Sequence, residues 1–117
     1  MNSVGLIIYP AADLAATTKF FATLLGTDPY VESKPYVGFK VGAMEIGLVP
    51  KTPQRGPSAA LAYVDVPDIK AALETLVAAG AERVQDITDV GYGLLVASVK
   101  DLDGTPIGLR QAPKPQA

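Results

Sequence analysis

The hydrophobic positions of the chain change their spacing several times, and each change marks the start of a predicted element. Residues 4–9 form a continuous apolar run of strand length, which Pro10 is expected to end. From Asp13 to Gly26 the apolar residues recur at helical spacing, so we expect a helix that Asp13 caps. The apolar stripe of this helix is expected to pack in the core, and it consists of Leu14, Phe20, Phe21, Leu24 and Leu25.

The pattern after this helix is that of short strands. We expect strands at residues 30–32, 36–41 and 44–49, separated by turn residues. Gly42 lies between the last two and can adopt the positive φ that a tight turn requires. These two strands are therefore predicted to form a hairpin.

The second half of the chain repeats this order of elements. We expect a strand at residues 60–66, a helix from Asp68 to Gly80, and strands at residues 83–87, 93–99 and 106–111. Each half also ends in the same Ile-Gly-Leu sequence, at residues 46–48 and 107–109. The order strand–helix–strand–strand–strand thus occurs twice, and we expect the two copies to build one shared cleft.

The segment between the halves has the composition of a linker. Residues 50–58 contain three prolines and one glycine. The length of 117 residues suits one domain. We therefore expect a single domain at residues 1–112, with module one at 1–50, a linker at 50–58 and module two at 59–112. A disordered tail is expected at 113–117, because its prolines have nothing to pack against.

The composition argues against several classes of function. The chain has no histidine and no cysteine, so the commonest metal ligands and nucleophiles are absent. The net charge is −2 and the basic residues are scattered, which argues against nucleic-acid binding. No apolar run reaches the roughly 20 residues of a membrane-spanning helix, and the N-terminus lacks the pattern of a secretory signal. We expect a cytoplasmic protein that binds neither nucleic acid nor membranes.

Three segments resemble the vicinal oxygen chelate superfamily, which includes glyoxalase I, bleomycin resistance proteins and extradiol dioxygenases. The first helix, with Asp13-Leu14, Phe20-Phe21 and Leu24-Leu25-Gly26, is similar to the "D-L…F-Y…L-G" helix of that family. Asp65-Val66-Pro67-Asp68-Ile69 resembles the "V-P-D" entry to its second module. The ending at residues 101–109 is similar to the family sequence "D-P-D-G-N-x-I-E-L". Together these segments span nearly the whole chain except the tail.

The resemblance implies an α+β fold of two βαβββ modules, whose curved mixed sheets surround a shared cleft. It also implies a homodimer, because dimers are frequent in the family. In metal-dependent members the ligands come from the first and last strands of each module. The corresponding positions of this chain are Leu61, Gly47, Gly108 and a residue within 4–6, all of them apolar or glycine. Such residues cannot donate a side-chain lone pair, so we expect no metal and no cofactor.

Strand alternation extends this set of cleft positions to nearby polar residues. Glu45 lies two residues from Gly47, Tyr63 lies two from Leu61, and Arg110 lies two from Gly108. Three further aromatic residues, Tyr36, Phe39 and Tyr92, suit a wall of the cleft. The predicted ligand-lining residues are Tyr63, Glu45, Gly47, Leu61, Gly108, Arg110, Phe39, Tyr36 and Tyr92. A structural interpretation stays open, in which the glycines permit close packing and Glu45 pairs with Arg110.

The sequence leaves three hypotheses for the function. The leading one is metal-independent binding of a small, partly apolar organic molecule, as in the sequestering resistance proteins of the superfamily. An alternative is a lyase or isomerase that uses carboxylates, or a relocated metal site at Glu45 or Asp65. A second alternative is a protein-interaction module with a filled cleft and an exposed apolar patch.

Overall fold

The computed structural model describes residues 1–33, 35–51 and 60–113, and these form two compact units. The first unit comprises Gly5–Leu61, and the second comprises Met1–Val4 together with Ala62–Ala117. Most of the predicted linker at 50–58 and most of the predicted tail at 113–117 lie outside the described residues.

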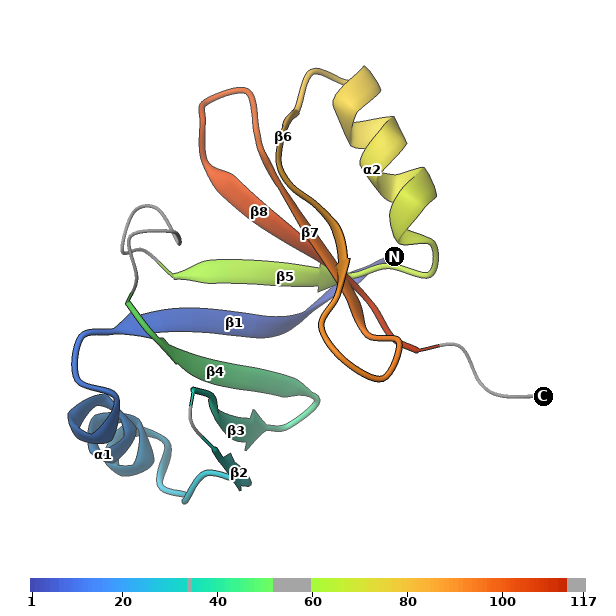
Figure 1. The fold of residues 1–117 in the computed structure, drawn as a ribbon. Helices are drawn as coiled ribbons and strands as arrows, with labels where there is room; N and C mark the ends of the chain where they lie inside the picture. The colour runs from blue at the N-terminus through green and yellow to red at the C-terminus, as the bar shows by residue number, and fades with distance from the viewer. Residues whose placement is uncertain (34, 52–59, 114–117) are drawn as a thin grey trace. The chain divides into compact units, whose positions relative to one another are not determined.

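The first unit is a four-stranded mixed sheet with one helix (Figure 1). Its strand order is β2-β3-β4-β1, in which β1 is parallel to β4 and the other neighbours are antiparallel. Its elements are β1 (Ser3–Ala11), α1 (Leu14–Leu25), β2 (Val31–Glu32), β3 (Val37–Val41) and β4 (Met44–Pro50). The predicted order of elements is therefore confirmed in this half.

The ends of α1 follow from the local chemistry of its sequence. The side chain of Asp13 accepts a hydrogen bond from the backbone N–H of Ala16 at 3.1 Å, as an N-cap does. Gly26 ends the helix with a φ of 72°, a left-handed conformation that glycine adopts without strain. The predicted end of the first strand at Pro10 was wrong. β1 continues to Ala11, because proline suits extended backbone and lacks only its own N–H.

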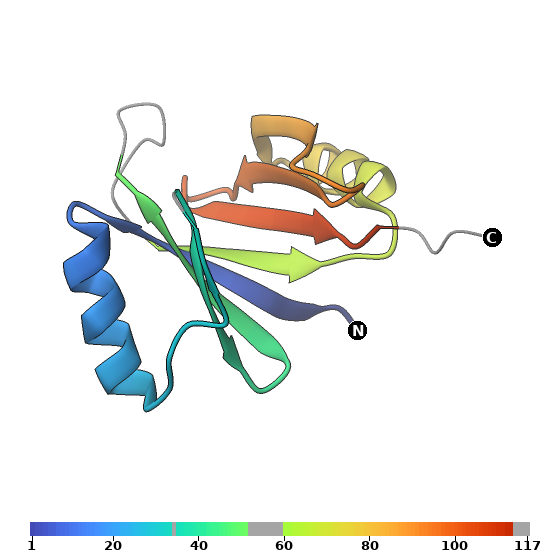
Figure 2. The same cartoon turned by 60° about the horizontal axis from the view of Figure 1, so that its bottom comes forward.

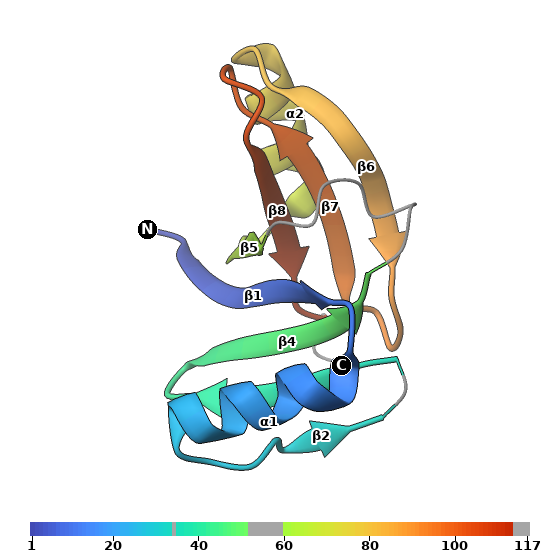
Figure 3. The same ribbon diagram turned by 90° about the vertical axis from the view of Figure 1, so that its left-hand side faces the viewer.

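Helix α1 covers one face of the sheet of the first unit (Figure 3), and the core of this unit lies between the two. Phe39 and Leu48 are fully buried there, and the ring of Phe39 lies 6.4 Å from that of Phe21 on the helix. The predicted stripe on α1 was wrong for two residues, because Phe20 and Leu24 are 62% and 65% exposed. Neighbouring residues point about 100° apart on a helix, so Phe20 cannot share the buried side of Phe21.

The second unit repeats this architecture (Figure 2). Its strand order is β5-β8-β7-β6, with β5 parallel to β8 and the other neighbours antiparallel. Its elements are β5 (Leu61–Asp65), α2 (Ile69–Ala78), β6 (Glu82–Asp89), β7 (Leu95–Lys100) and β8 (Pro106–Gln111). The described residues thus show the predicted α+β fold of two βαβββ modules.

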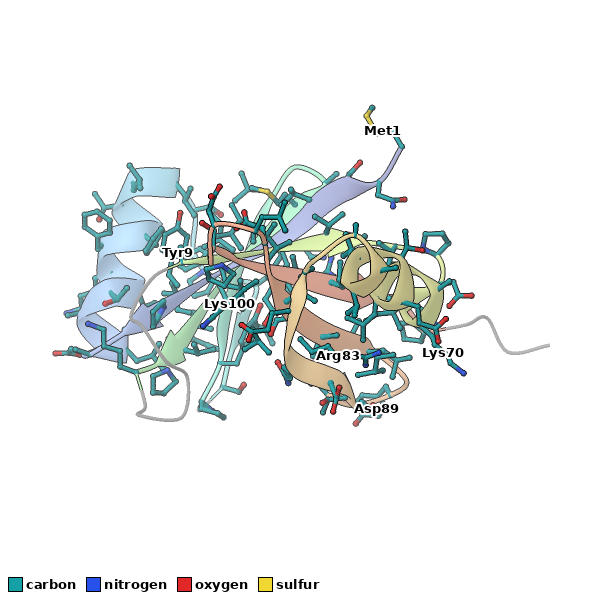
Figure 4. The ribbon with its side chains drawn as sticks, turned by 90° about the horizontal axis from the view of Figure 1, so that it is seen from above. Met1, Tyr9, Lys70, Arg83, Asp89 and Lys100 are labelled. Atoms are coloured by element: carbon teal, nitrogen blue, oxygen red, sulfur yellow. The ribbon has the colours of Figure 1, made fainter. Side chains whose placement is uncertain are left out.

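The core of the second unit lies beneath α2. Ile69 and Leu73 of the helix pack against Ala97, Val99 and Leu109 of the sheet, and all five are nearly or fully buried. Strand β6 contributes little to this core, because it is the last strand in the order and exposes almost every side chain. Its charged residues, with Arg83 and Asp89 labelled in Figure 4, and its irregular register discourage pairing with other chains.

A buried side chain from the last strand supports the start of α2. The backbone N–H of Ile69 donates to Oε1 of Gln111 at 2.8 Å, and Gln111 is only 9% exposed. This N–H belongs to the first turn of the helix and has no partner within the helix. Gln111 therefore ties α2 to β8 in addition to the N-cap that Asp68 provides.

Replacement of Gln111 by alanine is expected to lower the free energy of unfolding by about 1–2 kcal/mol, because it leaves a buried N–H without its acceptor. Chemical denaturation followed by circular dichroism would measure the loss. Asp68→Ala is the matched comparison, since it removes an exposed capping bond to Ala71 at the same helix end. An unchanged unfolding midpoint for Gln111→Ala would show that the buried bond contributes nothing.

Candidate functional site

The face of the first sheet turned away from α1 carries a carboxylate beside a pair of glycines. Because side chains alternate along a strand, Glu45 and Gly47 face away from the buried Ile46 and Leu48. The register places Gly38 of β3 beside Gly47. The same register places Lys40 of β3 beside Glu45. On the other side of β4, Ile8 of β1 lies beside Gly47. The opposite face carries Tyr9, which lies against Phe21 near α1 (Figure 4).

Two tyrosines donate hydrogen bonds to Glu45. The hydroxyl of Tyr30 donates to Oε1 at 2.6 Å, and the hydroxyl of Tyr36 donates to Oε2. Hydrogen bonds to an ionised carboxylate are stronger than those between neutral groups. The ammonium of Lys40 lies 4.8 Å from the ring centroid of Tyr30, which adds a cation–π contact. We call Tyr30, Tyr36 and Glu45 the tyrosine–carboxylate cluster.

The ring of Tyr36 lies directly on the two glycines. A Cβ atom built at Gly47 would stand 2.6 Å from both Cε1 and Oη of Tyr36, and 2.7 Å from Cδ1 of Ile8. A Cβ atom at Gly38 would stand 2.9 Å from Cε2 of Tyr36 and 3.0 Å from Cε1 of Tyr30. Such distances are far shorter than van der Waals contact. The absence of side chains at Gly38 and Gly47 is what allows the rings to lie against the sheet.

The second unit has a similar pairing of a tyrosine with a glycine. Tyr63 of β5 is level with Gly108 of β8, and a Cβ atom at Gly108 would stand 2.4 Å from Cδ1 of Tyr63. On the same face Arg110 binds Asp65 through two hydrogen bonds, Nε to Oδ1 at 2.6 Å and Nη2 to Oδ2 at 3.0 Å. The side chains of Arg110 and Asp65 are 19% and 44% exposed, so this pair is partly shielded from solvent.

The structure thus brings together two groups of the residues predicted from the sequence. Tyr36, Glu45 and Gly47 meet in the first unit. In the second unit Tyr63 lies against Gly108, and Arg110 follows two residues later on the same face. Three others lie elsewhere in their units. Phe39 is buried in the core beneath α1, Tyr92 is fully exposed between β6 and β7, and Leu61 begins β5.

Sequence reasoning missed Tyr30 and Gly38. Gly38 had a signal, because a hairpin that turns at Gly42 places it level with Gly47. Tyr30 had none, since its position depends on how the two-residue strand β2 pairs with β3. Asp65 lies two residues after Tyr63 on the same face of β5, and its bond to Arg110 follows from the parallel register of β5 and β8.

The family's metal site does not fit the residues of this chain. The positions that the sequence resemblance equates with the family's ligands carry Leu61, Gly47 and Gly108, which offer no side-chain donor atom for a cation. The space in front of both glycines holds a tyrosine ring. In the described ranges, no three Asp, Glu, His or Cys side chains come together as a metal centre would require.

The repeated βαβββ architecture defines a class of protein built from paired modules, and comparison with known proteins assigns the family. Residues 3–109 match the family model described as Glyoxalase/Bleomycin resistance protein/Dioxygenase superfamily. The chain belongs to this superfamily, as the sequence resemblance predicted. A comparison with curated protein sequences finds no match.

Solved structures of the same fold cover nearly the whole chain. A hypothetical protein from Bacillus halodurans superposes with a TM-score of 0.78 at 15% identity, covering 99% of this chain and 97% of its own. Methylmalonyl-CoA epimerase from Streptomyces coelicolor, in complex with 2-nitronate-propionyl-CoA, gives 0.76 at 15% identity, with 100% and 99% covered. A superfamily member from Vibrio splendidus gives 0.71 at 17% identity, with 95% and 98% covered. At these identities the likeness is one of fold.

Both helices are too short to cross a bilayer, and no span of suitable length and hydropathy occurs in the part of the chain that the structure describes.

Proposed function

We propose that this protein binds a small, partly apolar organic molecule without the help of a metal ion. The observation that carries the proposal is the replacement of the family's ligand positions by Gly47, Gly108 and Leu61, which removes the donors of a catalytic cation. The tyrosine–carboxylate cluster supports it, because it places polar groups beside the apolar side chain of Ile8. Few polar groups in an apolar setting are typical of small-molecule sites. A homodimer is proposed with it on the family resemblance, and a cytoplasmic location stays the expectation from the sequence.

The proposal is tested by thermal unfolding of the untagged protein against a broad panel of metabolites and antibiotics, with a chelator present. A ligand at 100 times its dissociation constant stabilises the folded state by about 2.7 kcal/mol. We expect at least one organic compound to raise the melting temperature in the chelator. Glu45→Gln should weaken that effect, because the amide is no longer a charged acceptor. The proposal would be contradicted if no compound stabilised the protein in the chelator. It would also be contradicted if stabilisation appeared only after addition of a divalent cation.

A second candidate function is an isomerase or lyase in which Glu45 moves the proton. Two hydroxyl donors on one carboxylate would hold such a base in a fixed orientation, and this observation favours the candidate. Turnover on acyl thioesters that carry an acidic α-proton would be the assay, since methylmalonyl-CoA epimerase shares the fold. Loss of turnover in a folded Glu45→Gln variant would favour catalysis over simple binding.

A further inference from the structure

The first unit has a hollow between the first half of α1 and the hairpin of β2 and β3. Its volume is about 340 Å³, near the lower end of the range for small-molecule pockets. Val37 packs in the core beneath α1, and Glu32 is level with it in the register of β2 and β3. The hollow therefore lies on the α1 face of the sheet, not on the face of the tyrosine–carboxylate cluster. The residues that line it are Leu14, Ala15, Thr18, Glu32, Ser33 and Val37.

The polar side chains of this hollow can only accept further hydrogen bonds. A hydroxyl group has one proton to donate, and both hydroxyls here already donate it. Oγ1 of Thr18 donates to the carbonyl oxygen of Leu14 at 2.7 Å, and Oγ of Ser33 donates to that of Tyr36 at 3.2 Å. The carboxylate of Glu32 has acceptors alone, and Glu32 has no ion pair among the described residues. A ligand that binds here must therefore supply the donors.

We propose that this hollow is a further binding site, and that it takes a primary ammonium group attached to an apolar body. An ammonium group has three N–H donors, no acceptor and a positive charge, so it complements two hydroxyl oxygens and a carboxylate. Leu14, Ala15 and Val37 supply the apolar wall against which the rest of the ligand is removed from water. The site is separate from the tyrosine–carboxylate cluster and does not depend on the proposed function.

The charges of the described residues around the hollow favour a cation. The start of a helix carries a partial positive charge, which would oppose one. In α1 this charge is offset by Asp13, whose side chain accepts from the N–H of Ala16 and whose carbonyl oxygen accepts from that of Thr17. Lys19 lies with Phe20 on another side of the helix. Glu32 is therefore the charged side chain that a ligand in the hollow meets.

Titration of the isotope-labelled protein with phenethylammonium chloride, followed by amide NMR, tests the site. We expect saturable shifts of the backbone signals of residues 14–18 and 32–33. Phenethyl alcohol and phenylpropionate, with a neutral and a negative head group on the same ring, should bind at least about fivefold more weakly. Trimethylated phenethylammonium keeps the charge but has no N–H group, so it should also bind more weakly than the primary amine.

Two substitutions, each with a matched control, locate the binding. Glu32→Gln should weaken the affinity for phenethylammonium about fivefold, as expected for an ion pair at a solvent-exposed rim. Glu82→Gln, on the exposed strand β6, should leave it unchanged. Ala15→Leu should abolish binding by filling the hollow, and leucine suits a helix. Ala16→Leu makes the same change on the side of α1 that carries Phe20, so it should have no effect.

The outcomes that overturn the inference are distinct from those that overturn the proposed function. Absence of saturable shifts, or binding that Ala15→Leu and Glu32→Gln leave unchanged, would overturn the site. Equal affinity for the alcohol or the trimethylated amine would overturn the ammonium group as the feature recognised. Binding lost in Glu45→Gln but kept in Glu32→Gln would place the amine at the tyrosine–carboxylate cluster instead. The panel of organic compounds tests that cluster separately, so failure of the amine site leaves the proposed function standing.

Discussion

Replacement of Phe39 by alanine will lower the free energy of unfolding by about 3–5 kcal/mol, the range measured for buried phenylalanines. Phe39 is 0% exposed and lies between the sheet of the first unit and Phe21 of α1. Truncation removes its apolar surface from the core and leaves a cavity that the strands on either side cannot close. A loss of this size is a large fraction of the stability of an ordinary domain.

Denaturant unfolding followed by circular dichroism measures this loss, with Phe20→Ala as the matched control. Phe20 carries the same side chain but is 62% exposed on the outer side of α1, so its truncation should cost less than about 1 kcal/mol. Equal losses for the two variants would mean that Phe39 does not form the centre of this core. The comparison also decides between two positions for Phe39. The sequence predicted it on a cleft wall, whereas the structure places it in the core.

The elements of the fold were predictable because their boundaries depend on local chemistry. Asp13 and Asp68 cap their helices through hydrogen bonds to the third residue after each. Gly26 and Gly42 adopt positive φ angles where a helix ends and a hairpin turns. Such features involve residues close in the sequence, so the sequence alone was enough to place them.

It was harder to predict which face of each helix or strand is buried, because burial depends on contacts with residues that are distant in the sequence. Phe20 and Phe21 have the same hydrophobicity, and only the position of the sheet decides that Phe21 is buried. The pattern of β3 has the same ambiguity. Phe39 shares a face with Val37 and packs under α1, whereas Tyr36, just before the strand, reaches the other face.

The candidate site was predictable only in part, because some of its contacts depend on how separate strands pair. Alternation along β4 correctly placed Glu45 and Gly47 on one face. It did not show that tyrosine rings would lie on the glycines, because that contact joins strands whose register the sequence does not specify. The glycines were predicted to leave space for a ligand. In the structure they accommodate Tyr36 and Tyr63, and their role in ligand binding stays a prediction.

Substitution of Gly108 by alanine will destabilise the protein at the upper end of the range of about 1–3 kcal/mol that overpacking costs. The new Cβ would stand 2.4–2.7 Å from Cδ1, Cε1 and Cγ of Tyr63. Cγ is the ring atom nearest the backbone, and Tyr63 is only 8% exposed, so the ring cannot turn aside without moving β5. Gly47→Ala is the matched control, because its nearest contacts are the outer ends of the Tyr36 and Ile8 side chains. That variant should cost less.

A double-mutant cycle with Tyr63→Ala shows whether the overlap is the cause. If the alanine at position 108 destabilises by meeting the tyrosine ring, removal of the ring should relieve at least about 1 kcal/mol of that cost, a coupling typical of residues in contact. Unfolding free energies of the two single variants and the double variant give the coupling directly. Additive losses would show that Gly108 is required by its own backbone instead. Such a coupling would mean that position 108 requires glycine because the ring of Tyr63 lies against it.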